Sequence, residues 1–424
     1  MKYTQNKKIM QVEETTLVVG IDIASEEHYA RAFDWRGVEV GKVMSFSNSR
    51  EGFEKLKTWM EKLKKENKKE KIICGAEPTG HYWFGIGQYL KEEEIKLVLV
   101  NPYHVKRSKE LDDNSPTKTD KKDPKTIAKL VIDGRYSEPY IAEKVYSEIR
   151  ILNEIRMSLT KEKIIIKNKV ERWLKIYFPE YKEVFSDWSK QGSLLILKQL
   201  PLPEDIRKKS KEEINEIWRA KKLRAVGMKR AEMLKEAAEK SIGSKEGLRS
   251  ARKELEILIK EYELKEMYYT EIMDEIEIII KEIKNAEKLL EIKGIGLGTV
   301  VGLIAEIGDI SRFESAKQIQ KLAGLSLMET SSGKHKGETS ITRRGRKRLR
   351  QILFQAVMPL VAKNEEFKEL HNHYITREKN ALRKKQSIVA ISCKLIRVVY
   401  AILKNGTKYE SGKVKEAIEL KKAV

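Results

Sequence analysis

The sequence predicts an α/β domain at the N-terminus and an all-α arrangement over the rest of the chain. Short apolar or alternating runs of strand length recur over residues 17–100, and segments with helical spacing separate the later runs. Beyond about Tyr140 the spacing is helical almost throughout. A chain of 424 residues with 40% hydrophobic content can bury more than one core. We therefore expect three domains, at residues 1–140, 141–285 and 286–424.

Three antiparallel strands are expected first. Leu17–Ile23 is an apolar run interrupted by Gly20 and Asp22, and the alternating segments His28–Asp34 and Val38–Phe46 flank a turn at residues 35–37. The patterns that follow are helix Glu51–Lys65, strand Lys71–Ala76, helix His81–Glu93, strand Lys96–Val100 and a helical segment from Tyr103. The order βββαβαβα predicts a mixed sheet flanked by helices, which is the layout of an RNase H-like fold.

Four carboxylates stand where such a fold can bring them together. Asp22 lies inside an apolar strand, where a charge is costly without a partner, and Glu77 directly follows the next strand of the pattern. Asp120 and Asp123 can share one helix face, although an Asp before a proline also fits a plain helix N-cap. Oxygen ligands without His or Cys favour Mg²⁺ or Mn²⁺, and a pair of such ions can support phosphoryl transfer. We therefore hypothesise a metal-dependent phosphoryl-transfer site.

The middle of the chain carries two long amphipathic regions, Ser147–Tyr177 and Leu223–Ile283. The second region is dense in Lys and Glu, with apolar residues at intervals of three and four, which is compatible with a coiled-coil arm. Because the heptad regularity is imperfect, a helical hairpin folded on itself fits equally well.

A glycine-rich turn, Lys293–Gly298, separates two segments with helical spacing, Ala286–Ile292 and Thr299–Ile307. In a helix-hairpin-helix such glycines allow backbone N–H groups to approach a phosphate, which makes Gly294, Gly296 and Gly298 candidate nucleic-acid contacts. The alternative is a tight turn between packed helices.

Residues 328–350 combine hydroxyl groups with dense positive charge. Ser331 and Ser332 stand beside Gly333 in what we expect to be a flexible loop. The candidate phosphate contacts in and after this loop are Lys334, Lys336, Arg343, Arg344, Arg346, Lys347, Arg348 and Arg350. A loop of this kind contacts a phosphate backbone more often than it attacks one. His81 and His335 are interpreted as surface or phosphate-contact residues.

The overall charge points to a polyanionic partner. The formal net charge is +22, and nucleic acid fits this better than a membrane surface, because the longest apolar stretches, such as Thr299–Ile307, are too short for a span. The N-terminal segment is polar, and Cys74 and Cys393 form no ligand pattern. We expect a cytoplasmic protein without zinc.

Several ordered motifs together resemble one family, the DEDD transposases of insertion sequences, which are bridge-RNA-guided recombinases with a RuvC-like catalytic domain. The motifs are Gly20-Ile-Asp22-Ile-Ala, Glu77-Pro-Thr-Gly-His-Tyr-Trp83, Asn101-Pro102 with Lys118-Thr-Asp120-Lys-Lys-Asp123, Lys293-Gly-Ile-Gly296, Ser332-Gly333, Ile341-Thr-Arg-Arg-Gly345 and Leu349-Arg350. The resemblance covers nearly the whole chain. Pro78 and Pro124 depart from it, because many relatives carry small residues there.

The resemblance implies that Asp22, Glu77, Asp120 and Asp123 are the metal ligands of the RuvC-like domain. It further implies that a serine of a C-terminal transposase domain attacks the scissile phosphate and forms a covalent phosphoserine link to DNA. The motif serine precedes the glycine, which selects Ser332, with Ser331 as the alternative. A structured bridge RNA would pair with donor and target DNA.

About 200 residues separate Asp123 from the serine pair, which leads us to expect a composite site in a homo-oligomer, a dimer or tetramer, with the serine donated by another protomer. Two other functions remain open. One is a Holliday-junction resolvase-like nuclease that uses water as the nucleophile. The other is a non-catalytic nucleic-acid-binding scaffold, which leaves Asp22 unexplained.

Overall fold

The computed structural model describes residues 4–78, 80–112, 123–328, 331–332, 335–336, 339–410 and 412. The chain divides into two compact units, Met1–Ile141 and Ala142–Val424. This boundary lies next to the predicted end of the first domain, and the further division at residue 285 stays a prediction.

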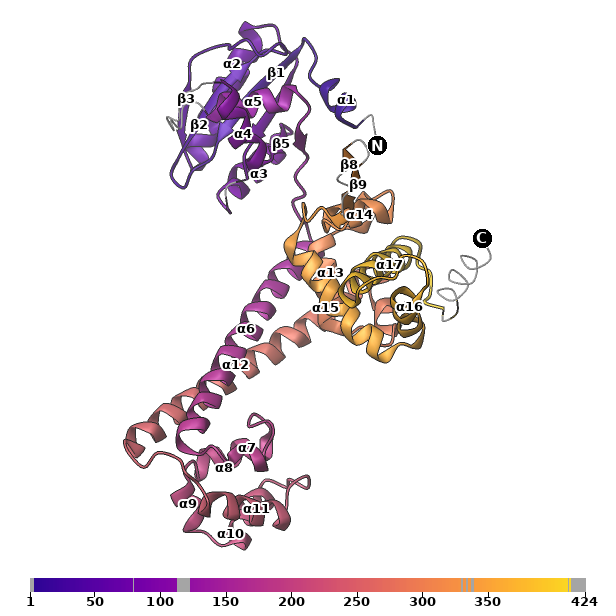
Figure 1. The fold of residues 1–424 in the computed structure, drawn as a ribbon. Coiled ribbons are helices and arrows are strands. Elements are labelled where there is room, and N and C mark those ends of the chain that lie inside the picture. Colours follow the sequence, from indigo (N-terminus) through magenta and orange to yellow (C-terminus); the bar gives the residue numbers. More distant parts are fainter. Residues whose placement is uncertain are drawn as a thin grey trace. The chain divides into compact units, whose positions relative to one another are not determined.

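The first unit contains a mixed six-stranded sheet in the order β3-β2-β1-β4-β5-β6 (Figure 1). Its strands are β1 (Thr16–Asp22), β2 (Glu27–Phe33), β3 (Met44–Ser47), β4 (Lys71–Ala76), β5 (Lys96–Val100) and β6 (Tyr136–Ser137). The sequence β1-β2-β3 is antiparallel, whereas β4 and β5 are parallel to β1. The predicted α/β class and RNase H-like arrangement are confirmed.

Two details of the sheet differ from the sequence prediction. The expected third strand, Val38–Phe46, is shortened to β3, because Asp34 accepts hydrogen bonds from the backbone N–H groups of Arg36 and Val38 and Gly41 adopts a φ of +84°. Before β3, the expected strand pairs with its neighbour through a single isolated antiparallel bridge between Phe33 and Glu39. The short edge strand β6, antiparallel to β5, was not predicted.

Helices cover both faces of this sheet. They are α1 (Thr4–Ile9), α2 (Arg50–Glu66), α3 (Trp83–Glu92), α4 (Pro102–Asp112) and α5 (Asp123–Ile132). On one face Leu56 of α2 and Ile86 of α3 join a core with Val19 and Ile21 of β1. On the other face residues of α5 pack against alternate residues of the same strands, such as Val18 and Ile73. The strand period of two thus separates two cores.

The second unit is helical. Its helices are α6 (Val145–Tyr177), α7 (Tyr181–Val184), α8 (Gln191–Gln199), α9 (Pro203–Arg207), α10 (Lys211–Ala220), α11 (Met228–Glu239), α12 (Leu248–Glu282), η1 (Glu287–Glu291), α13 (Leu297–Ile307), η2 (Ile310–Arg312), α14 (Ala316–Leu322), α15 (Lys347–Lys363), α16 (Glu365–Thr376) and α17 (Lys384–Asn405). Its described residues also contain the short strands β7 (Leu327–Met328), β8 (Ser331–Ser332), β9 (His335–Lys336) and β10 (Ser340–Ile341), in which β8 pairs with β9 and the outer β7 pairs with β10.

The two long helices α6 and α12 run side by side in opposite directions (Figure 1). The indole Nε1 of Trp173, near the end of α6, donates to the carbonyl oxygen of Ala251, near the start of α12, over 2.9 Å. Further along, Lys265 pairs with Glu162 over 2.7 Å. The helix α12 of the region Leu223–Ile283 therefore packs along α6, which lies outside that region, so the region forms an arm with α6 and is not a hairpin folded on itself. We call the pair α6 and α12 the arm.

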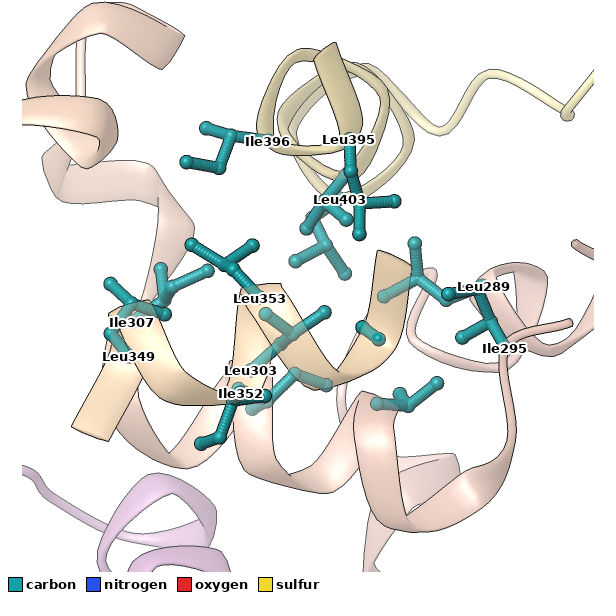
Figure 2. Close-up of a cluster of buried hydrophobic side chains, with 14 of the residues drawn as sticks. Leu289, Ile295, Leu303, Ile307, Leu349, Ile352, Leu353, Leu395, Ile396 and Leu403 are labelled. Atoms are coloured by element: carbon teal, nitrogen blue, oxygen red, sulfur yellow. The ribbon is translucent and has the colours of Figure 1, made fainter. Parts of the chain in front are cut away.

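The arm joins two separate cores. At its far end, the apolar side chains of α7–α11 pack with residues of α6 and α12 around the buried Trp173 and Trp218. At its near end α13, α15 and α17 build the C-terminal core, where Leu303, Leu353 and Leu395 point toward one another (Figure 2).

Among the residues that the structure describes, one helix is long and apolar enough to cross a membrane by length and composition. This is α17, and half of its most apolar window is buried. The sequence predicts a buried helix over residues 387–403, and the structure confirms it. Leu395 and Val399 belong to the C-terminal core, so α17 packs as the central helix of that core.

Candidate active site

The ends of β1 and β4 place two of the predicted ligands next to each other. The parallel register pairs Gly20 with Gly75 and Ile21 with Ala76, so the next position on each chain is Asp22 and Glu77. Asp22 is the last residue of β1, and Glu77 follows the last residue of β4. Both side chains are half-buried. The two residues therefore lie on neighbouring strand ends at the carboxyl edge of the sheet, where ligand sites of open α/β sheets lie.

Helix α5 reaches this edge because β1 carries a glycine there. A Cβ on Gly20 would lie 1.8 Å from the carbonyl oxygen of Pro124, and one on Gly75 would lie 2.4 Å from Cγ2 of Val131. The paired glycines thus allow the close approach of α5, which lies over the sheet (Figure 1). Asp22 and Gly20 are two residues apart and share this face. Asp123, the first residue of α5, accordingly starts the helix beside the two strand ends.

Three predicted ligands, from β1, from the end of β4 and from α5, thus approach one edge. The fourth, Asp120, lies outside the described residues. Their oxygen donors are of the type that suits Mg²⁺ or Mn²⁺. Among the residues that the structure describes, however, no three His, Cys, Asp or Glu side chains are gathered closely enough to hold a metal ion. The backbone brings the positions together without assembling a complete ligand set from the described side chains.

The turn after Asp22 is held by two residues that the sequence analysis did not single out. Nδ1 of the buried His28 accepts a hydrogen bond from the backbone N–H of Ala24 over 3.2 Å. The side-chain amide of Asn48 donates to the carbonyl oxygen of Ser25 over 3.1 Å. Burial lowers the pKa of His28, which favours the neutral ring that this acceptor role requires. The position of His28 on the inward side of an alternating strand is the sequence feature that could have indicated this role.

The predicted serine loop is built from paired strands. Ser331 and Ser332 form β8, which pairs antiparallel with His335 and Lys336 of β9, and the outer strands β7 and β10 pair in the same sense. The expectation of a flexible loop is therefore corrected for these residues, whose backbones form ladder hydrogen bonds. Gly333 and Lys334 lie outside the described residues, as do the side chains of both serines and of Lys336. His81, by contrast, is exposed beside Tyr82.

The basic segment after this hairpin divides into two groups. Arg343, Arg344 and Lys347 are exposed. The other three bind groups of their own unit: Arg346 donates to the carbonyl oxygen of Glu306 over 2.5 Å, Arg348 pairs with Glu154 over 3.4 Å, and Arg350 donates to the carbonyl oxygen of Ala323 over 2.9 Å. A Cβ on Gly345 would lie 2.5 Å from the backbone nitrogen of Gly324. Only part of the predicted contact set is thus directed to solvent.

The three glycines of the predicted helix-hairpin-helix have different environments. Gly294 adopts a φ of +102°, and a Cβ there would lie 2.9 Å from Cα of Leu360, so this glycine forms the tight turn against α15. Gly296 faces open space at the start of α13. A Cβ on Gly298 would lie 3.0 Å from Nη1 of Arg156, whose guanidinium is oriented by the buried Asn153. The segment before the turn is the 3₁₀ helix η1, where the sequence predicted an ordinary helix.

Two family models match the chain. A transposase model matches residues 19–179, and the model described as the transposase IS116/IS110/IS902 family matches residues 286–372. Together they span more than half of the chain. The first match contains Asp22, Glu77, Asp120 and Asp123, and the second contains both serines and the basic segment.

Curated relatives align with shorter parts of the chain. The pilin gene-inverting proteins of Moraxella bovis and Moraxella lacunata are each 36% identical to it over 128 residues, which is 30% of this chain and 38% of the relative. The transposase for insertion sequence element IS1111A of Coxiella burnetii is 25% identical over 141 residues, or 33% of this chain and 38% of the relative. The chain thus matches well under half of the length of these relatives.

Proposed function

Because this chain belongs to the IS116/IS110/IS902 transposase family, we propose that it cuts and rejoins DNA by serine attack at a carboxylate-bound metal site. The observation that carries this proposal is the register of β1 and β4, which aligns Asp22 with Glu77 beneath the first turn of α5. Carboxylates aligned in this way repel each other, and a divalent cation relieves that repulsion.

The ligands in this proposal are Asp22, Glu77, Asp120 and Asp123, which would hold Mg²⁺ or Mn²⁺. A bound ion would supply positive charge to the scissile phosphate and lower the pKa of a coordinated hydroxyl group. The Gly20–Gly75 pair allows α5, which begins with Asp123, to lie close to β1 and β4, and the turn after Asp22 is held by His28 and Asn48.

The nucleophile in this proposal is Ser332, with Ser331 as the alternative. The serine Oγ would form a bond to phosphorus while one P–O ester bond of the DNA strand breaks. The serine hydroxyl loses its proton and the leaving DNA oxygen gains one. Because an ester bond replaces an ester bond, the reverse attack by another DNA end restores the phosphodiester without an external energy source. The paired strands β8 and β9 would limit the movement of this backbone.

The partners in this proposal are donor and target DNA and a structured bridge RNA that selects them by base pairing. The net charge of +22 supports nucleic-acid partners of this kind. The carboxylates and the serines belong to different compact units, which is compatible with a composite site in a dimer or tetramer. We also propose that the protein acts on DNA in the cytoplasm.

The test is a trapping experiment. The purified chain is incubated with the end DNA of its element, Mg²⁺ and the flanking noncoding RNA, and it is then denatured. We expect a protein–DNA adduct that is absent in Ser332→Ala and in Asp22→Asn and is retained in Ser331→Ala. The adduct should also depend on the RNA.

Other outcomes would replace the proposal. If DNA cleavage persists in both serine variants and no protein–DNA adduct forms, the chain is a resolvase-like nuclease that uses water as the nucleophile. Absence of cleavage by the wild-type chain, together with DNA binding that is unchanged in Asp22→Asn, would identify a non-catalytic scaffold.

A further inference from the structure

The far end of the arm carries a basic loop outside both family matches, which leave residues 180–285 uncovered. The loop joins α10 to α11 within the group of short helices at this end (Figure 1). Residues 219–230 contain six Lys or Arg and no Asp or Glu. The core beneath them, around the buried Trp218, gives the loop a rigid base.

Two of the six basic residues build the loop. Arg219 donates from Nη1 to the carbonyl oxygen of Leu223 over 2.7 Å and from Nη2 to that of Val226 over 2.9 Å. Arg230 donates to the carbonyl oxygen of Val184 and lies over the ring of Phe185. These guanidinium groups satisfy backbone carbonyl oxygens and so hold the loop in one conformation.

The other four, Lys221, Lys222, Arg224 and Lys229, are exposed. None of them forms an ion pair with a carboxylate in the part of the chain that the structure describes, whereas the nearby Lys209 pairs with Glu213. Lys222 adopts a φ of +56° just after the end of α10, where its N–H and that of Leu223 donate to the carbonyl oxygens of Arg219 and Trp218. This is a common way for a helix to end, and it fixes the backbone that carries Lys221 and Lys222.

The start of α11 adds to the positive potential. Its N-cap is Gly227, no side chain caps it, and its first turn contains no acidic residue. The free N–H groups and the helix dipole favour an anion at this end, yet the residue present in the first turn is the cation Lys229. Cations and a positive helix end stand together, which is the arrangement that a phosphate group relieves.

We infer that Lys221, Lys222, Arg224 and Lys229 form a contact surface for the phosphate backbone of duplex DNA. No aromatic residue occurs in residues 219–230, so the base-stacking side chains of single-strand binding surfaces are missing. Cations without stacking groups contact a backbone and carry no sequence information. The choice of DNA over duplex RNA rests on the proposed function, and the experiment separates the two.

The test compares two full-length variants with the same change in charge. In the first, Lys221, Lys222, Arg224 and Lys229 are replaced by Gln. In the control, the exposed and ion-paired Arg50, Lys62, Lys253 and Lys260 are replaced by Gln. Binding to a duplex of arbitrary sequence, about 40 base pairs long, is measured in EDTA over a range of salt concentrations. EDTA prevents metal-dependent cleavage, so the result does not depend on the active site.

For the first variant we expect the slope of log affinity against log salt to fall by about 3–4, close to one for each lost phosphate contact. The control variant should keep the wild-type slope. A third variant with Lys221→Arg, Lys222→Arg and Lys229→Arg, which keeps Arg224 and all four charges, should also show the wild-type slope. Both variants should unfold at the wild-type temperature, because the changed side chains are exposed. An unchanged slope in the first variant, or an equal loss in the control, would overturn the inference. A loss confined to a duplex RNA of the same length would also overturn it and would assign the surface to RNA.

If the trapping experiment fails while this loss of DNA affinity is observed, the proposed function is wrong and the DNA surface stands. If the trapping experiment succeeds while the DNA affinity of the first variant is unchanged, the proposed function stands and the DNA surface is wrong.

Discussion

Replacing Gly20 by Ala tests whether the contact between β1 and α5 sets the geometry of the candidate site. The added Cβ would lie 1.8 Å from the carbonyl oxygen of Pro124, 2.8 Å from its carbonyl carbon and 3.0 Å from the backbone nitrogen of Ala128. All three are backbone atoms, so no side-chain rotation removes the clash. Because carbon and oxygen atoms approach to about 3.3 Å at closest, α5 must move away by about 1.5 Å.

The displacement has a stability cost and a larger functional cost. Overpacking a core lowers the free energy of unfolding by about 1–3 kcal/mol. For a unit of this size that corresponds to a fall in Tm of about 3–5 °C per kcal/mol. A shift of about 1 Å at a reacting group costs on the order of 100-fold in rate, so we expect DNA cleavage to fall at least that far. Asp123 should carry most of this loss, since it begins the helix that moves.

Gly85→Ala is a matched control. The Cβ added to Gly85, inside α3, would meet its nearest atoms at 3.8 Å, an ordinary contact. This variant should unfold at the wild-type temperature or be more stable by about 0.5–1 kcal/mol, because alanine is the better helix former. Thermal unfolding and the trapping assay are measured for both variants and the wild type. If Gly20→Ala keeps both the wild-type Tm and the wild-type cleavage rate, the argument that this glycine positions α5 is refuted.

Two further changes have definite expected results. Burial lowers the pKa of His28 below its usual value near 6.5, so the unfolded state binds more protons, and stability present above about pH 6.5 declines as the pH falls below that value. Thermal unfolding between about pH 5 and pH 8 should show a weaker pH dependence in His28→Gln than in the wild type, and equal dependence would contradict this origin. In Gly345→Ala the new Cβ would lie 2.5 Å from the nitrogen of Gly324 and from the carbonyl oxygen of Leu322, so Tm should fall by several degrees and DNA affinity should fall with it. Wild-type values of both would show that the basic segment does not need this contact.

The carboxylate positions were accessible from the pattern of residues because they depend on strand order and strand ends. An acidic residue at the end of an apolar strand and another directly after the next parallel strand become neighbours along the sheet once those strands pair in register, and the pairing of Ile21 with Ala76 places Asp22 and Glu77 in this way. The hydrogen bonds that hold the turn after Asp22 could not be predicted from the sequence in the same way. His28 acts through a hydrogen bond to the backbone of Ala24, and that bond exists only because the turn brings the two together.

For Ser331 and Ser332 the sequence predicted the wrong local structure, a loop in place of a strand. Gly and Ser residues are typical of loops, yet Ser331 and Ser332 form ladder bonds with a partner strand. Two-residue strands are too short to leave a period-two pattern, so pairing of this kind leaves little trace in the sequence.

Hydrophobic periodicity is a local property, and it was sufficient for the α/β class of the first unit, for its element order βββαβαβα without β6, and for the helical remainder of the chain. The partners of each side chain depend on distant segments. The antiparallel packing of α6 on α12, the packing of Gly294 against α15 and the internal hydrogen bonds of Arg346 and Arg350 all required the folded chain. Positive charge is visible in the sequence, whereas the division between cations that bind their own fold and cations that face solvent is settled by packing alone.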